Sequence, residues 1–131
     1  MNLDSAIAHL QHRVPGLMAV YLFGSQATGQ ATVDSDVDLA VLVDGCISAL
    51  ELWALSGELA DIVQRPVDLL DLRSASTVMQ YQIITTGRRI AGGGVQAGVY
   101  EAYILSEKTA LDTARAGLLS DIYQEGRVHA R

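Results

Sequence analysis

Two apolar segments in the first third of the chain predict a pair of neighbouring β-strands. Residues 18–23, MAVYLF, form a short continuous apolar run, which is typical of a buried strand. In residues 36–43, DVDLAVLV, one set of apolar positions recurs with the period of two that a strand requires. Residues 24–35 leave room for the chain to turn back. Antiparallel pairing would then bring the end of the first strand beside the start of the second.

Apolar residues at helical spacing predict helices over residues 2–13, about 48–64, about 76–86 and about 96–123. Ser48 and Glu51 form a capping box at the start of the second of these, and Trp53 is expected at the margin of its buried stripe. Residues 26–30 are expected to form one further helical turn that ends at Gly29. In sequence order, helices therefore come before and after the two predicted strands.

The run at residues 66–72, PVDLLDL, predicts a third strand. The helix before it spans roughly 25 Å at 1.5 Å per residue, enough to bring the chain back alongside the second strand. The third strand should therefore lie parallel to the second through a right-handed crossover. A short strand is also expected over residues 88–91. The sequence thus predicts an α/β (α+β) protein in which helices flank a small mixed sheet. Residues 1–131 form a single domain, with a core over about 15–91 and a long C-terminal helix over about 96–123.

Residues suited to nucleotide chemistry gather where these strands begin and end. Gly24 and Ser25 follow the first strand; Gly24 has no Cβ to hold a phosphate away, and Ser25 offers a hydroxyl and a backbone N–H. Asp36 and Asp38 open the second strand and point to the same face, with Cα atoms roughly 6.5 Å apart. Paired carboxylates of this kind can converge on hard cations. The combination suits a nucleoside triphosphate carried by magnesium.

Strand parity separates the two acidic residues of the third strand. Asp68 lies at the end near Asp36 and Asp38, and it shares a face with Leu70. Asp71 points to the opposite face and is expected in the turn or the cap before Ser74. Asp68 is therefore the candidate for a third carboxylate at the site.

Gly24-Ser25 alone, or Asp36-x-Asp38 alone, would indicate only a structural turn, because Asp and Ser favour turns before strands. The two together favour function. Gly24-Ser25, ten residues and then Asp36-x-Asp38 resemble the signature of the nucleotidyltransferases related to DNA polymerase beta. The short length and the wording GSQATGQATVDSDVDLAVLV are most similar to the minimal nucleotidyltransferases, which pair with HEPN-domain partners in toxin–antitoxin operons. Such families often carry Arg where this chain has Gln26 and Thr28.

The resemblance implies transfer of AMP from ATP to a hydroxyl, and specifically to a tyrosine of a HEPN-type RNase toxin, which the chain would silence as its antitoxin. It implies magnesium, with two ions, held by Asp36, Asp38 and Asp68. Asp68 would also act as the general base for the acceptor, and it fills the place of the family's third carboxylate. Gly24 and Ser25 would grip the β and γ phosphates. Arg88 and Arg89 could add positive charge, although solvation at the surface is favoured for both.

The composition of the chain limits the kinds of partner and the cellular compartment that we expect for it. The net charge is −6, which argues against a nucleic-acid polymerase, because proteins that grip phosphate backbones do so with clustered Lys and Arg. Half of the residues are hydrophobic, yet no stretch reaches membrane-spanning length and the N-terminus lacks the layout of a signal peptide. A single cysteine, Cys46, agrees with a reducing compartment. We expect a cytoplasmic protein that uses a protein or small-molecule acceptor.

Two other functions are compatible with these residues. One is nucleotidyl transfer to a small molecule, as in the aminoglycoside nucleotidyltransferases, although those carry an acceptor-binding domain for which this chain has no room. The other is a catalytically idle module that neutralises a partner by occlusion. The last helix has two interpretations as well: its apolar stripe covers the sheet, or its C-terminal half, with Leu118 and Ile122, extends beyond the core as an interaction surface.

Overall fold

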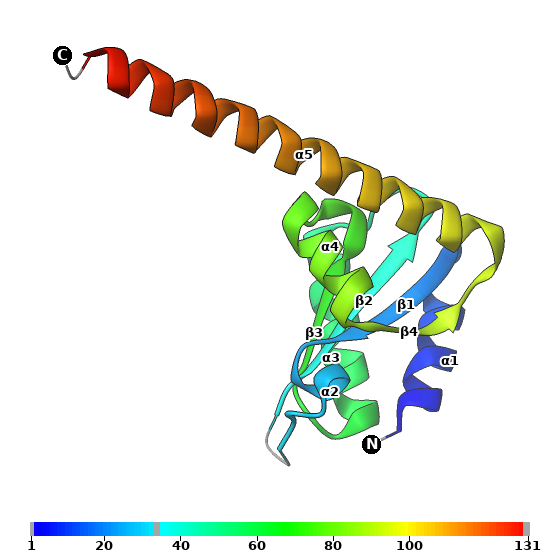
Figure 1. Cartoon of the computed structure of the whole chain (residues 1–131). Helices are drawn as coiled ribbons and strands as arrows, with labels where there is room; N and C mark the ends of the chain where they lie inside the picture. The colour runs from blue at the N-terminus through cyan, green and yellow to red at the C-terminus, as the bar shows by residue number, and fades with distance from the viewer. Residues whose placement is uncertain (1, 33–34, 130–131) are drawn as a thin grey trace.

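The computed structural model describes residues 2–32 and 35–129, with side chains as far as residue 122. A four-stranded mixed sheet carries helices on both faces (Figure 1). The elements follow the chain as α1 (Leu3–Arg13), β1 (Leu17–Phe23), α2 (Ser25–Thr28), β2 (Val37–Val43), α3 (Ala49–Val63), β3 (Val67–Asp71), the 3-10 turn η1 (Leu72–Ser74), α4 (Thr77–Thr86), β4 (Arg88–Gly92) and α5 (Gly94–His129). The predicted fold class and the predicted elements are confirmed.

The strand order is β3-β2-β1-β4. β1 pairs antiparallel with both β2 and β4, whereas β2 and β3 are parallel. In the predicted pairing, the end of β1 meets the start of β2, with Phe23 opposite Asp38. The crossover through α3 returns the chain so that Asp68 lies opposite Asp38 on the neighbouring strand.

Alternation along the strands divides the core into two layers, because successive side chains point to opposite faces of a sheet. One layer lies under α1 and α3, and it contains the buried residues Val37, Leu39, Val41, Leu55 and Leu59. The other lies under α4 and α5 and contains Ala40, Leu42, Ile83, Ala97 and Ile104. The central strands are therefore buried on both faces along most of their length, and the polar residues of β2 stand at its first end.

Three helices begin at side-chain caps, and the cap at Ser48 is the one that the sequence predicts. The side chains of Asn2, Ser48 and Ser76 each accept a hydrogen bond from a backbone N–H of the first turn of α1, α3 and α4. Such caps each stabilise a helix by about 1 kcal/mol. Trp53 departs from the expectation: it lies on the outer face of α3 with 77% of its surface exposed.

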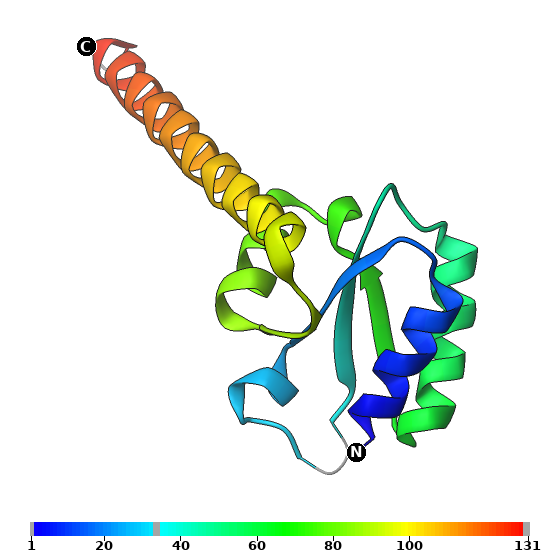
Figure 2. The same cartoon turned by 90° about the vertical axis from the view of Figure 1, so that its right-hand side faces the viewer.

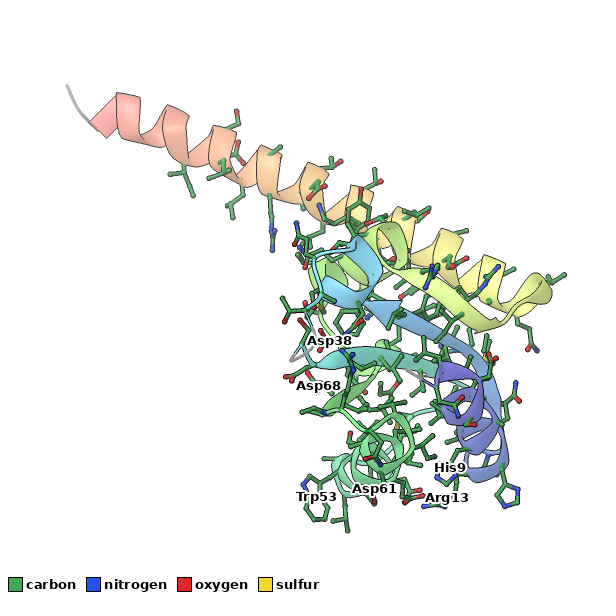
Figure 3. The ribbon with its side chains drawn as sticks, turned by 90° about the horizontal axis from the view of Figure 1, so that it is seen from below. His9, Arg13, Asp38, Trp53, Asp61 and Asp68 are labelled. Carbon is green, nitrogen blue, oxygen red and sulfur yellow. The ribbon has the colours of Figure 1, made fainter. Side chains whose placement is uncertain are left out.

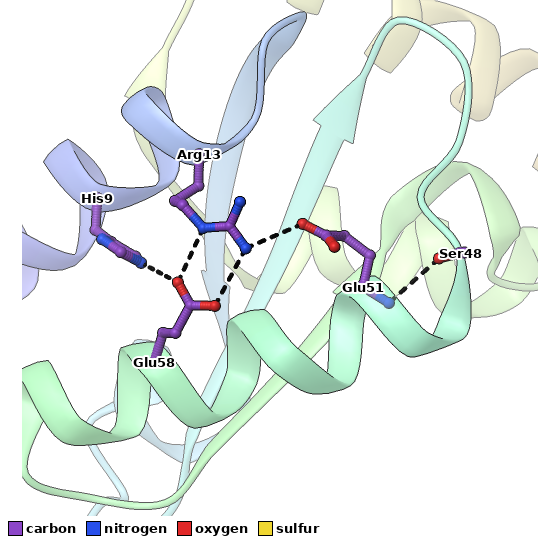
Figure 4. Close-up of polar contacts among 5 residues, drawn as sticks. All are labelled: His9, Arg13, Ser48, Glu51 and Glu58. Carbon is purple, nitrogen blue, oxygen red and sulfur yellow. Dashed lines mark hydrogen bonds and ion pairs between the residues drawn. The ribbon is translucent and has the colours of Figure 1, made fainter.

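An ionic cluster fastens α1 to α3 (Figure 4). Glu58 accepts hydrogen bonds from Arg13 Nε at 3.0 Å and contacts His9 Nε2 at 2.6 Å, while Arg13 also reaches Glu51 at 3.3 Å. The bonds from Arg13 and His9 lower the pKa of Glu58 to about 2. His9 is therefore part of a helix-to-helix contact.

The helix α5 is longer than expected, because it runs over 36 residues from Gly94 to His129. Its first turns cover the sheet through Ala97, Tyr100 and Ile104, and the rest projects away from the body (Figures 1 and 2). Tyr100 donates a hydrogen bond to Gln80 of α4 at 2.6 Å. Within the described part of the chain, no helix is both long enough and apolar enough to cross a membrane.

A second set of contacts fixes the root of α5 on the sheet. Glu101 accepts hydrogen bonds from the buried Tyr21 hydroxyl at 3.1 Å and from Arg89 at 3.2 Å. Gly92, with φ +78°, allows the close approach of β4 to β1 that precedes the helix, since a Cβ there would overlap the backbone of Met18. The position of α5 is thus set by specific side-chain contacts with two strands.

Candidate active site

Three segments far apart in the sequence meet at one edge of the sheet, where β1 ends and where β2 and β3 begin. Asp38 and Asp68 are direct neighbours in the parallel register of β2 and β3 (Figure 3). Adjacent strands lie about 4.8 Å apart, so the two carboxylates lie side by side on the sheet face that carries α4 and α5. Gly24 follows Phe23, the residue opposite Asp38, and closes the edge from the other side.

The turn after β1 requires glycine for two independent reasons. Gly24 has φ +71°, a conformation that other residues rarely adopt, and a Cβ at this position would collide with the Asp38 carboxylate. The Gly24 carbonyl accepts hydrogen bonds from the backbone N–H groups of Ala27 and Thr28 at 3.1 and 3.2 Å, which closes the short helix α2. Ser25 begins that helix and directly follows Gly24, whose bare backbone lies against the Asp38 carboxylate.

Asp36 stands two residues before Asp38, exposed to solvent and just outside the strand. The neighbouring Ser35 is held in place through its carbonyl, which accepts from the Gln26 side chain at 3.4 Å, and through its hydroxyl, which accepts from the Thr32 N–H at 2.7 Å. Gln26 is therefore engaged within the loop that leads to Asp36.

The sequence argument did not consider Arg65. This side chain donates a hydrogen bond to the Thr32 carbonyl at 3.3 Å and so connects the turn before β3 with the loop before Asp36. The only signal in the sequence is its place three residues before Asp68, which does not reveal a contact across 33 positions. The structure therefore places a guanidinium at the loop that leads to Asp36.

The two arginines of β4 lie elsewhere. Arg89 is paired with Glu101 at the root of α5. Arg88 lies opposite Leu22, whose side chain belongs to the layer under α1 and α3 rather than to the face that carries the carboxylates. The structure therefore does not bring either of them to Asp38 and Asp68.

The electrostatics of the edge favour a cation. Burial raises the pKa of Asp38, and the nearby carboxylates of Asp68 and Asp36 raise it further. None of the ion pairs found in the described part of the chain involves these three residues. Repulsion between carboxylates that lack a basic partner is relieved when a positive ion binds.

The donor set fits magnesium in particular. Asp36, Asp38 and Asp68 offer only carboxylate oxygens, the ligands that hard cations take. Among the residues that the structure describes, no three His, Cys, Asp or Glu side chains form a closed cluster around an ion position. Magnesium is typically held by one or two carboxylates together with substrate phosphates, and an open carboxylate edge next to a phosphate turn matches that description.

Asp71 has a structural role. It is only 2% exposed and accepts hydrogen bonds from the Ile47 N–H at 3.0 Å, the Arg73 N–H at 3.2 Å and the Ser74 hydroxyl at 3.1 Å. The expected turn and cap are confirmed, and in addition Asp71 connects β3 to the segment before α3. Asp71 therefore faces away from the site, as strand parity predicts.

A groove of about 510 Å³ opens beside Asp68, between α3 and the edge strand β3. Its floor along α3 contains the small residues Ala54 and Gly57, and the exposed Trp53 lies at its border. Three other cavities in the described structure are lined by residues other than Asp36, Asp38 and Asp68. This groove is thus a concave surface that adjoins a site carboxylate.

Comparison with known proteins agrees with this geometry. The family model described as polymerase beta nucleotidyltransferase matches residues 5–92, which include the whole sheet and all five candidate site residues. The chain belongs to this family, and the fold and the carboxylate edge together define a nucleotidyltransferase.

More closely related proteins cover almost the entire chain. The protein adenylyltransferase MntA of Shewanella oneidensis is 33% identical over 122 residues, which cover 93% of this chain and 88% of MntA. A crystal structure of a toxin–antitoxin with AMP-PNP contains a chain that superposes with a TM-score of 0.84 at 33% identity, covering 93% of this chain and 98% of that one. The structure of a tri-AMPylated Shewanella oneidensis HEPN toxin in complex with its MNT antitoxin gives a TM-score of 0.76 at 31% identity, covering 91% and 93%.

Proposed function

We propose that this chain is a magnesium-dependent protein adenylyltransferase that transfers AMP from ATP to a tyrosine hydroxyl of a HEPN-type RNase toxin and so acts as its antitoxin. The observation that carries the proposal is the placement of Asp38 and Asp68 in register beside Gly24. This arrangement occurs in a chain that is similar to a protein adenylyltransferase over 93% of its length. The proposal also places the protein in the cytoplasm, together with its ATP.

The nucleotide would lie with its triphosphate across the edge. Gly24 admits the β and γ phosphates close to the backbone, and the Ser25 hydroxyl donates a hydrogen bond to one of their oxygens. Magnesium ions, held by Asp36, Asp38 and Asp68, would supply neutralisation of the negative charge that develops on the transferred and leaving phosphates. The carboxylates and the turn are part of the folded sheet, so the triphosphate meets a site that is already formed.

The reaction is an in-line displacement at the α phosphorus. A bond forms between the acceptor tyrosine oxygen and this phosphorus, and the bond from the phosphorus to the bridging oxygen of pyrophosphate breaks. Asp68 takes the proton of the tyrosine hydroxyl as general base, a role typically worth 10²–10⁴-fold in rate. Pyrophosphate leaves with the electron pair of the broken bond, so charge and atoms balance without a further reactant.

The groove beside Asp68 lies on the α3 side of the edge strand β3, and it would receive only the segment of the acceptor that carries the tyrosine. Asp68 lines this groove, whereas Gly24 and Ser25 approach Asp38 from the opposite side of the edge. Nucleotide and acceptor can therefore approach Asp68 from different directions, as an in-line displacement requires. The small residues on α3 leave room for a polypeptide that carries the tyrosine.

The test is transfer in a purified system. The chain is incubated with labelled ATP, magnesium and the product of the neighbouring reading frame, the expected HEPN toxin, and the acceptor is examined by intact mass. We expect the acceptor to gain the mass of AMP. Asp36→Asn and Asp38→Asn should each abolish the gain without changing the thermal melt, because each removes a ligand charge from a polar edge rather than from the core.

The two alternatives give different results in this assay. A small-molecule transferase would leave the toxin unmodified and would release pyrophosphate from ATP only after a small molecule with an acceptor hydroxyl is added. An idle binding module would neutralise the toxin equally well with Asp38→Asn as with the wild type. Either result would reject the proposed function.

A further inference from the structure

The projecting half of α5 carries an apolar surface whose outer end is exposed to solvent in the described chain. We define the arm stripe as Leu111, Leu118 and Ile122. Leu118 is 60% exposed and Ile122 is 55% exposed, whereas Leu111, nearer the body, is half-buried. Apolar side chains that recur along one side of a solvated helix typically mark a binding surface.

The arm stripe continues the face by which α5 packs on the sheet. Ile104 is buried in the core, and Leu111 and Leu118 follow at intervals of seven residues. A repeat of seven keeps side chains on one side of a helix and is the spacing with which helices pack against other helices. The stripe therefore faces the same way as the core contacts of α5, although no part of the described body lies beneath its outer end.

This orientation relates the arm to the active site. From Ile104 to Ile122 the helix extends over roughly 27 Å at 1.5 Å per residue. In Figures 1 and 3 it projects on the side of the body where the carboxylate edge lies, with Asp38 and Asp68 marked in Figure 3. A protein bound under the arm stripe would therefore occupy the angle between α5 and the catalytic edge.

The relatives indicate which kind of protein occupies that angle. The family model ends at residue 92, before α5 begins. The match to MntA includes 122 of the 131 residues, so at most 131 − 122 = 9 residues are left out and at least 36 − 9 = 27 residues of α5 are shared. The chain of the toxin–antitoxin structure with AMP-PNP likewise covers 93% of this chain. The arm is thus common to chains that occur in complexes with a protein partner.

We propose that the arm stripe is the docking surface for the protein acceptor, which binds it through an apolar helix of its own. The inference rests on the proposed function, because it concerns the acceptor of that reaction. The arm holds the acceptor so that its tyrosine reaches Asp68, and binding energy from a remote surface thereby positions the reacting hydroxyl. Selection of the acceptor depends on Leu118 and Ile122 and not on the carboxylates.

The test compares two matched double variants of the full chain. Leu118→Asp with Ile122→Asp places two charges in the arm stripe. Ala116→Asp with Ser120→Asp places the same charges, with the same spacing, on the opposite side of the helix, since each residue turns the helix by about 100°. All four residues are exposed, so both variants should melt like the wild type.

The readouts are KM for the acceptor, kcat at saturating acceptor and the dissociation constant for ATP. The stripe variant should raise KM about tenfold or more, because charges in a desolvated contact weaken binding strongly, and leave kcat and ATP binding unchanged. The control variant should match the wild type in all three. Leu118→Ala with Ile122→Ala should give a smaller increase in KM in the same direction.

The outcomes distinguish this inference from the proposed function. If the wild type transfers no AMP to the acceptor, the proposed function fails. If the wild type transfers AMP and the stripe variant does so with an unchanged KM, the docking surface is elsewhere. If light scattering shows the wild type to be a dimer and the stripe variant a monomer, with KM unchanged, a second copy of the chain covers the stripe and the inference is overturned.

Discussion

The two acidic residues of β3 lead to opposite expectations, and a pair of substitutions separates them. Asp68→Ala changes an exposed side chain at the site, whereas Asp71→Ala changes a carboxylate that is 2% exposed. The first should remove catalysis and keep stability, and the second should reduce stability and keep catalysis. The asymmetry follows from strand parity and can be calculated from the contacts.

The loss expected for Asp71→Ala is larger than the cost of a helix cap. The substitution removes three hydrogen bonds to a buried carboxylate and leaves the N–H groups of Ile47 and Arg73 without that acceptor. Hydrogen bonds to a charged group and unpaired buried donors each contribute about 1–3 kcal/mol, so we expect a loss of about 3–5 kcal/mol. For a chain of this size, this corresponds to a decrease in Tm of roughly 10–20 °C.

Asp68→Ala should change Tm little and slow single-turnover transfer by about 10²–10⁴-fold, as for the loss of a general base, with any loss of metal binding in addition. Binding of ATP should largely persist, because Asp36, Asp38 and Gly24 remain. The assays are thermal melts and single-turnover transfer below the lower Tm. If Asp71→Ala is inactive while folded and Asp68→Ala is active, the assignment of the two faces of β3 is wrong.

Two further substitutions test the turn and the helix cluster. Gly24→Ala should lower transfer by about 100-fold, because its Cβ displaces the Asp38 carboxylate and misplaces the reacting groups; rapid chemical quench measures this, and wild-type activity would show that the turn does not matter. Glu58→Gln should reduce stability above about pH 4.5. Arg13 and His9 lower the pKa of Glu58 to about 2, so in this pH range the ionised carboxylate stabilises the folded state. The difference in Tm from the wild type should decrease as pH falls from 4.5 towards 2, and an equal difference at pH 3 and pH 7 would contradict this.

The arrangement of the carboxylates could be predicted because it depends on local rules. The length of α3 brings the start of β3 back beside the start of β2, and the period of two places Asp38 and Asp68 on one face of the sheet. The register of Asp38 with Asp68 follows from these two facts. Asp36 was expected to open the second strand, but it lies just before β2, where this period does not apply. The catalytic roles of these residues remain predictions that the substitutions above test.

Contacts between distant segments could not be predicted from the sequence. Asp71 was expected as a cap, but its bond to Ile47 joins residues 24 positions apart. Arg65 reaches Thr32 across 33 positions, and no pattern in either segment indicates it. The outward direction of Trp53 depends on how α3 rotates on the sheet, which a hydrophobic stripe determines only approximately.

Because α5 is long and is attached to the body only near its start, a small change in its angle there moves its outer end by a large distance. Glu101 contacts Tyr21 and Arg89 near the start of the helix, and Ile122 lies some twenty residues farther along. A tilt of the helix by about 5° at Glu101 would move Ile122 by roughly 3 Å, since the intervening helix rises 1.5 Å per residue. Substitution of the surface residue Glu101 would therefore shift the outer end of α5 relative to the carboxylate edge, and a change of angle at the base of this helix would alter which shapes fit between the two.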